Sequence, residues 1–206
     1  MQRFNAEASK KTLIHTWYVY PIVVAFVTLL WIWAFYAFHQ PSTHQILTVF
    51  VSAEVNNPNF NKEILKHYER EDLREVNIYN SVSNSQGFYA KMNLYIQKGD
   101  ILILSEQLVN EFSGNLNIPF VEFTEEIKTK YCNGDYQYYE ENDKAYGIKL
   151  KSKGEACWLD SYVKFEDTNY YLLLTQSSKN LGAIYDEKNE HYDNAFTSIK
   201  YFMGEQ

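Results

Sequence analysis

Few side chains in this 206-residue chain could do chemistry, and their spacing forms no known catalytic pattern. His67 and His191 fall in the region expected to fold, and His191 stands within an acidic stretch, residues 186–193. A histidine near carboxylates can bind a metal or transfer a proton, but a polar run of this kind is more often a solvated loop. The chain has no nucleophile, zinc or phosphate-binding motif. We therefore expect no catalytic residue, no metal and no cofactor, in a protein that is not an enzyme.

The two cysteines of the chain are Cys132 and Cys157. Outside the cytoplasm they could form one disulfide. With no second pair of cysteines and no nearby histidine, they make a poor zinc site. A disulfide is the favoured interpretation, and two free thiols are the alternative.

Aromatic residues are dense in the second half of the chain. Tyrosine and tryptophan form flat platforms for sugars or peptides and are enriched at protein interfaces. The same residue types also fill and cover β-rich cores. We expect part of the group to form a ligand or partner surface, for which the candidates are Tyr131, Tyr136, Tyr138, Tyr139, Tyr146 and Trp158.

The element around which the rest of the chain is organised is residues 17–38, a run of 22 residues without a charge. At about 1.5 Å per residue it would form a helix of roughly 33 Å, enough to cross a hydrocarbon core of about 30 Å. Tryptophan and tyrosine lie at both ends, as expected at headgroup depth. A cleaved signal peptide is the alternative, although its apolar region usually has about 7–15 residues before a small-x-small cleavage site. An uncleaved signal-anchor is the favoured interpretation.

The flanking charges predict the orientation of this helix. Three bases and one acid precede it, and the next charged residue after it is Glu54. Positively charged flanks stay in the cytoplasm. The prediction is a single-pass cell-membrane protein with four parts: a cytoplasmic tail (1–16), a transmembrane helix (17–38), a polar stalk (39–45) and an extracytoplasmic domain (46–206).

The predicted exterior part carries 25 acids and 16 bases, a net charge of −9. This excess of acid argues against nucleic acid or an anionic membrane surface as a partner. The chain is rich in asparagine, yet no asparagine is followed by x-Ser/Thr. Together with the abundance of Lys, Tyr and Ile, this is typical of a bacterial source.

The first part of the domain alternates between strand and helix patterns. Apolar or alternating runs at 46–53, 74–80 and 100–104 predict strands. Asn57-Pro58 predicts the start of the first helix, Gly99 the end of the second, and Ser105 the cap of the third. The inward stripes of the first two helices are Phe60, Ile64 and Tyr68, and then Phe88, Met92, Tyr95 and Ile96. Such alternation implies a parallel sheet with helices on its faces.

After Thr124 the pattern becomes β-rich. Residues 145–150, 158–165 and 170–175 predict strands, and a final helix should end at Gly204. No linker separates the two halves. The fold class is therefore α/β: one N-terminal transmembrane helix followed by a single mixed-sheet domain.

The order of these elements resembles the N-terminal lobe of bacterial extracellular solute-binding proteins of ABC transporters. The residues that carry the resemblance are Asp100-Ile-Leu-Ile-Leu104 before a helix, the extended piece Ile118–Phe123, and Tyr146-Gly-Ile-Lys-Leu150, where Lys149 replaces the usual proline. The resemblance implies a single periplasmic-binding-protein-like lobe close to a transporter. Members of that family have two lobes around a ligand cleft, and this chain has room for one.

Two functions follow as expectations. The first is a membrane-anchored extracytoplasmic interaction module, an accessory subunit that docks on other membrane-protein subunits such as those of an ABC-type transporter. The second is a membrane-tethered receptor for a sugar, peptide or amino acid with an aromatic-lined site.

Overall fold

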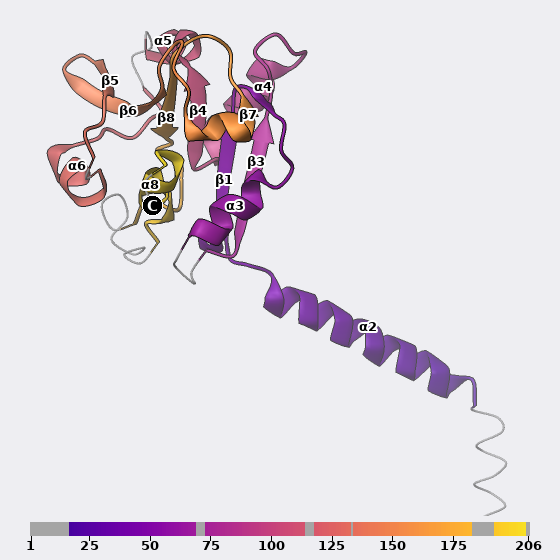
Figure 1. The fold of residues 1–206 in the computed structure, drawn as a ribbon. Helices are drawn as coiled ribbons and strands as arrows, with labels where there is room; N and C mark the ends of the chain where they lie inside the picture. Colours follow the sequence, from indigo (N-terminus) through magenta and orange to yellow (C-terminus); the bar gives the residue numbers. More distant parts are fainter. Residues whose placement is uncertain (1–16, 69–72, 114–117, 133, 183–191, 205–206) are drawn as a thin grey trace, which may run out of the picture. The chain divides into compact units, whose positions relative to one another are not determined.

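The computed structural model describes residues 17–68, 73–113, 118–132, 134–182 and 192–204 (Figure 1), so the predicted tail lies outside it. The chain divides into two units, Met1–Gln40 and Pro41–Gln206. The elements are α2 (Val19–His39), η1 (Thr43–Gln45), β1 (Ile46–Val51), β2 (Glu54–Val55), α3 (Phe60–His67), β3 (Glu75–Asn80), α4 (Phe88–Lys98), β4 (Ile101–Ser105), α5 (Glu106–Ser113), α6 (Glu125–Tyr131), β5 (Tyr138–Glu141), β6 (Lys144–Lys151), η2 (Trp158–Ser161), β7 (Val163–Lys164), β8 (Tyr170–Leu174), α7 (Asn194–Thr197) and α8 (Ile199–Phe202). The labels η1 and η2 denote short 3-10 helices.

The apolar helix α2 is the one helix in the described part of the chain that is long and apolar enough to cross a membrane. None of its residues is buried by other parts of the chain. Pro21 lies in its first turn, where the missing N–H costs little. The helix predicted at 17–38 is confirmed with small shifts at its ends. A signal sequence near the N-terminus passes the same test of length and composition.

A six-stranded mixed sheet forms the centre of the second unit. Its strand order is β3-β1-β4-β8-β6-β5. Strand β1 pairs in parallel with β3 and with β4. Strand β8 runs antiparallel to β4 and β6, and β5 and β6 form an antiparallel hairpin. The predicted parallel first half and β-rich second half are both confirmed.

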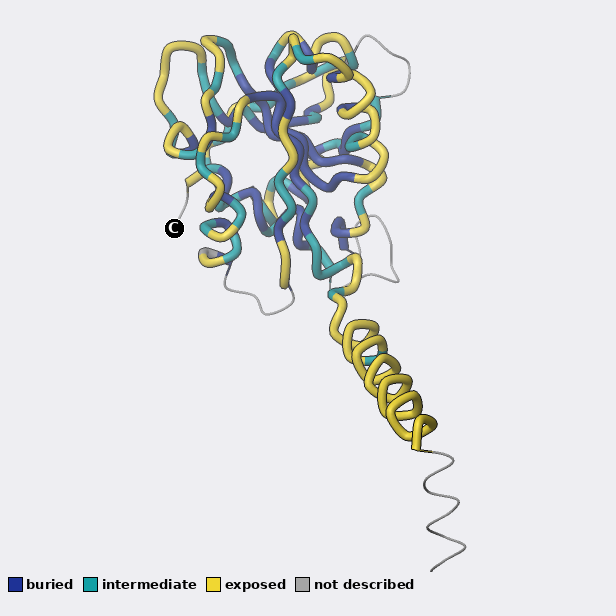
Figure 2. Tube along the Cα trace, turned by 90° about the vertical axis from the view of Figure 1, so that its right-hand side faces the viewer, coloured by how far each residue is buried: buried dark blue, intermediate teal, exposed yellow. Residues whose placement is uncertain are grey.

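The sheet is buried on both faces. On β4, Ile101 and Ile103 pack into one core with α3, α6, α7 and α8, which we call the first face. Leu102 and Leu104 pack into another core with α4 and α5, the second face. Buried strands accordingly run through the middle of the domain in Figure 2, with exposed residues around them. An uninterrupted apolar strand is expected where helices cover both sides of a sheet.

The first crossover helix begins later than predicted. Asn57 and Pro58 form a turn instead, in which the Asn57 side chain accepts from the amide of Asn59 at 2.9 Å. The helix α3 then starts at Phe60, whose amide donates to the Asn57 carbonyl at 3.2 Å. Phe60, Ile64 and Tyr68 are buried, as the sequence spacing predicts.

The second half contains two departures from the predicted pattern. A helix, α6, follows Thr124, whose hydroxyl accepts from the amide of Ile127 at 3.4 Å. The strand predicted over 158–165 is instead the 3-10 helix η2 and the two-residue strand β7, which pairs with β2 in a separate small sheet. The cause is local: the Asp160 carboxylate accepts from the amide of Cys157 at 2.9 Å and closes a turn there. The final helix is present as α7 and α8.

The stalk predicted over 39–45 is divided between the two units of the chain. His39 is the last residue of α2, and the second unit begins at Pro41. The ring of His44 stacks on Tyr192 with centroids 4.3 Å apart. The Asn194 side chain donates to the His44 carbonyl at 2.8 Å. His39 and Gln40 of the predicted stalk belong to the first unit, and residues 41–45 belong to the second.

Candidate functional site

The six aromatic candidates do not gather on one surface. Tyr131, Tyr136, Tyr138 and Trp158 pack against the core of the first face, whereas Tyr139 and Tyr146 pack against the core of the second face. Tyr138 and Tyr139 are consecutive on β5, and successive side chains of a strand point to opposite faces. All six are half-buried. A single aromatic platform is therefore not what the structure shows.

The contacts of these aromatics explain their burial. Tyr131 stacks on Phe196 at 4.8 Å and donates its hydroxyl proton to Asp193 at 2.7 Å. The Trp158 indole donates to the Phe202 carbonyl at 2.7 Å. Such contacts are how a large side chain with one polar group is accommodated at the edge of a core. These residues hold the helices of the first face in place.

Cys132 and Cys157 form no disulfide with each other in the described structure, contrary to the predicted bond. Cys132 is buried at the end of α6, and burial followed by this neighbouring thiol raises the pKa of Tyr138. Cys157 is half-buried before η2, and burial followed by the nearby Asp160 charge raises the pKa of its thiol. Both cysteines pack against the core of the first face, so their number along the chain was no guide to pairing.

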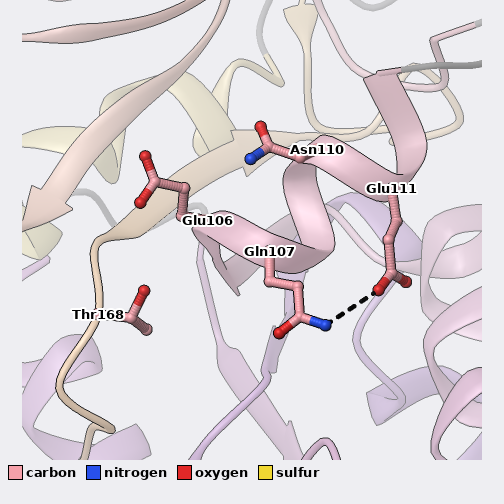
Figure 3. Close-up of a pocket in the computed structure, with 5 residues that line it drawn as sticks. All are labelled: Glu106, Gln107, Asn110, Glu111 and Thr168. Atoms are coloured by element: carbon pink, nitrogen blue, oxygen red, sulfur yellow. Dashed lines mark hydrogen bonds between the residues drawn. The ribbon is translucent and has the colours of Figure 1, made fainter.

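A polar depression at the carboxyl end of β4 is the candidate site (Figure 3). Helix α5 begins directly after this strand. Strand β4 ends at Ser105, and the helix starts at Glu106. The depression has a volume of about 520 Å³ and is wide open to solvent. Its lining is polar throughout: Glu106, Gln107, Asn110, Glu111 and Thr168.

The two carboxylates of the depression are held by neighbouring side chains. Glu106 accepts from the Asn169 amide at 2.9 Å and from the Tyr171 hydroxyl at 3.5 Å. Glu111 accepts from Gln107 at 3.4 Å and from the Tyr89 hydroxyl at 3.2 Å. Figure 3 shows the bond between Gln107 and Glu111 on the exposed side of α5.

The two carboxylates of the depression suit a polar or positively charged group. The Glu111 hydrogen bond raises the pKa of Tyr89, while burial and then the Glu106 charge raise the pKa of Tyr171. Both hydroxyls therefore stay protonated at neutral pH and act as hydrogen-bond donors. The arrangement can hold a polar or positively charged group.

Metal ligands do not converge in the part of the chain that the structure describes. The candidate His191 lies outside the described residues, as does the side chain of His67. The depression itself was missed from the sequence, because its residues belong to α5 and to the loop before β8, 57 positions apart at Glu111 and Thr168. Only the strand-then-helix pattern at 100–112 marked this end of the sheet.

A second polar cluster lies at the opposite end of β4. Asp100 is buried, and its carboxylate accepts from the Thr48 amide at 2.7 Å and the Asn180 side chain at 3.0 Å. Ser178 also donates to it. Burial raises the pKa of Asp100, and these hydrogen bonds together with the nearby His44 charge act against that rise. The cluster joins β1, β4 and the segment after β8, which is a structural role.

Comparison of the chain with protein-family models, with curated proteins and with solved structures finds no match. The site is therefore defined by its geometry alone.

Proposed function

We propose that this protein is a single-pass, membrane-anchored extracytoplasmic interaction module. It acts as an accessory subunit that docks on a membrane complex, such as an ABC-type transporter. The observation that supports this most directly is the join between the two units: α2 ends at His39 and the folded domain begins at Pro41.

The join matters because it limits how far the domain can travel. An exposed apolar helix of 21 residues is stable in lipid, where its side chains need no other partner. Pro41 follows within two residues, so a chain anchored by α2 has no long spacer before its domain. Tethering of this kind raises the effective concentration of neighbouring membrane proteins, and a weak contact can then suffice.

The bases before the helix favour a cytoplasmic N-terminus and an exterior domain. The sheet order adds support for a solute-binding-like lobe, since β3-β1-β4 is a parallel doubly wound half with the antiparallel β8 beside it. The segment Tyr146-Gly147-Ile148 forms part of β6 within the sheet, where Gly147 lies against the backbone of Leu172. Solute capture in that family needs two lobes, and residues 41–206 form one compact unit, so docking is the function we favour.

Purification of the full-length protein in a mild detergent, after crosslinking in intact cells, tests the proposal. We expect one membrane subunit to co-purify at a fixed ratio. The control is a variant in which the tail and α2 are replaced by a cleavable secretion signal, which should lose most of the co-purifying subunit. Monodisperse protein without a crosslinked membrane subunit would count against the proposal.

A receptor for a small ligand is the alternative, and the polar depression beside Glu106 is the observation in its favour. Its lining differs from the aromatic site expected from the sequence. A sugar or amino acid would meet carboxylates and amides there rather than tyrosine rings. The open shape of the depression leaves most of a bound ligand in solvent, whereas small-ligand sites usually bury most of it.

A further inference from the structure

The two edges of the central sheet are protected to very different degrees. Strand β5 forms one edge, has four residues, is bulged between Tyr139 and Glu140, and carries two glutamates. Strand β3 forms the other edge, has six residues, and keeps a continuous register with β1 from Glu75 to Asn80. Short length, bulges and charges are the usual protection of an edge. The β3 edge has no bulge and no proline, and its one charged residue, Glu75, stands at its start.

The peptide groups on the free side of β3 can be assigned from its hydrogen bonds. The Ser81 amide donates to Val51 of β1 at 3.1 Å. Because successive residues of a strand turn their peptide groups to opposite sides, Tyr79 and Asn77 also point toward β1. The N–H and C=O groups of Val76, Ile78 and Asn80 then point away from the sheet.

No backbone hydrogen bond reaches these outward groups from any described loop or helix. Among the described residues, backbone hydrogen bonds outside the regular helices and strands reach Arg74 before β3 and Ser81 after it, and none reaches a residue within the strand. An edge with free donors and acceptors is a template for another strand.

The side chains beside this edge are apolar and basic. Tyr79 is 43% exposed and stacks on Tyr95 of α4 at 4.7 Å, and Leu94 is 42% exposed. Lys91 and Lys98 are exposed and lie four residues before and three residues after Tyr95, so they share its side of the helix. Figure 1 shows α4 beside β3. Helix α4 has no acidic residue, although the predicted exterior part has a net charge of −9.

We propose that the β3 edge binds an extended acidic segment of a partner protein by strand addition. The segment would pair with the outward peptide groups of Val76, Ile78 and Asn80. Its apolar side chains would lie over Tyr79 and Leu94, and its carboxylates would face the two lysines of α4. The inference rests on the proposed function, in which that partner is a subunit of the membrane complex.

Charge argues for such a segment over a second copy of this chain. Antiparallel pairing of two β3 strands has two-fold symmetry, so each surface meets its own copy. Both α4 helices would then lie on one face with Lys91 and Lys98 brought toward their counterparts. Like charges in that arrangement repel, whereas a segment rich in glutamate or aspartate is attracted.

The test compares Ile78→Pro with Ile78→Ala in full-length protein held in lipid nanodiscs. Proline removes the outward N–H and blocks an incoming strand, yet leaves the pairing with β1 intact. Alanine trims the same side chain and keeps the N–H. The probe is a labelled peptide, blocked at both ends, in which every second residue is in turn valine or glutamate and threonine fills the positions between, so that valine and glutamate share the face turned toward α4. Its affinity is measured by fluorescence anisotropy.

We expect Ile78→Pro to weaken binding by at least about ten-fold relative to Ile78→Ala. Lys91→Glu with Lys98→Glu should weaken it as well, and a valine–lysine peptide should bind poorly to the unmodified protein. Equal affinity of the proline and alanine variants, or no binding of the valine–glutamate peptide, would overturn the proposal. Dimers of the unmodified protein that Ile78→Pro dissociates would also overturn it, because the edge would then serve a second copy.

The crosslinked subunit separates this proposal from the proposed function. If the subunit still co-purifies with Ile78→Pro, the proposed interaction module stands, but the β3 edge is not its docking surface. Loss of the subunit with Ile78→Pro, but not with Ile78→Ala, would support both.

Discussion

At the scale of single residues, the surroundings of the Asp100 carboxylate should have the largest effect on how stability depends on pH. Its carboxylate is buried between β1, β4 and the segment after β8. Asn180 gives its amide hydrogens to Asp100 and to the Ile46 carbonyl, each at 3.0 Å. These bonds fix the start of β1 against the start of β4. The cost is a buried carboxylate whose charged form has lost its water.

Stability should depend on pH through this carboxyl group. Burial raises the pKa of Asp100 in the folded state, against an ordinary value of about 3.9. The folded protein then binds this proton more readily than the unfolded chain does. Its contribution to stability is full below the ordinary pKa and is lost as pH rises through the raised pKa. The free energy of unfolding of the wild type, relative to Asp100→Asn, should fall from pH 4 upward.

The measurement is urea unfolding of the full-length protein in detergent, followed by near-ultraviolet circular dichroism across that pH range. Asp160→Asn is the control with opposite sign. Burial pushes the pKa of Asp160 upward, but the hydrogen bond from Lys151 at 2.8 Å and the Cys157 amide lower it overall. That contribution is present above the ordinary pKa and is lost as pH falls. The same slope for both variants would contradict the assignment.

Individual site residues were the hardest to predict from the sequence. Density along the chain grouped Tyr138 with Tyr139, although neighbours on a strand face opposite sides. The cysteines suggested a pair from their number, while their surroundings depend on α6 and η2, which the sequence pattern did not reveal. The β3 edge was predictable as a strand, but its place at the edge depends on strand order.

At the scale of elements, the β5–β6 hairpin shows how a turn sets the register of a strand pair. Asn142 and Asp143 have φ angles of 52° and 63°, in the left-handed region. A two-residue turn with both angles positive matches the twist of the strands it joins, and asparagine and aspartate tolerate it better than most residues.

Substitutions at the two positions of this turn should differ in their effect on the free energy of unfolding. Asn142→Ala places a side chain with a Cβ and no local hydrogen bond at positive φ, which should cost about 1 kcal/mol of unfolding free energy. Asp143→Gly should leave stability unchanged or raise it slightly, since glycine is the preferred second residue of such a turn. Urea-unfolding midpoints at neutral pH give both values. Loss of stability in Asp143→Gly equal to that in Asn142→Ala would be inconsistent with this turn.

Elements defined by long apolar runs were predicted well. Strands β1, β4 and β8 and the stripe of α4 follow from burial on both faces or on one side of a helix. Elements fixed by a single polar contact were not predicted. The Thr124 cap of α6 and the Asp160 turn of η2 are examples. A hydrophobic pattern is summed over many residues, whereas a cap depends on one.

At the scale of the whole molecule, the second unit begins where α2 ends. The polar contacts of His44 with Asn194 and with the Lys179 carbonyl at 3.0 Å tie the first residues of the domain to its last helices and the segment before them. Residues 41–45 are therefore unavailable as a flexible spacer. Any partner of the domain must come within reach of the membrane surface if α2 is anchored there.

Anchoring by α2 predicts that the full-length protein stays with membranes after an alkaline carbonate wash. Leu30→Arg should release part of it, because an arginine near the centre of a membrane helix costs about 2.5–3.5 kcal/mol on insertion scales. Tyr18→Arg is the matched control, since a long basic side chain near a helix end can reach the interface at little cost. Immunoblots of pellet and supernatant give the fractions, and mass spectrometry of the N-terminus shows whether α2 is retained. Mature protein that begins after Phe38 would identify α2 as a cleaved signal sequence, and equal release of both arginine variants would argue against a spanning helix.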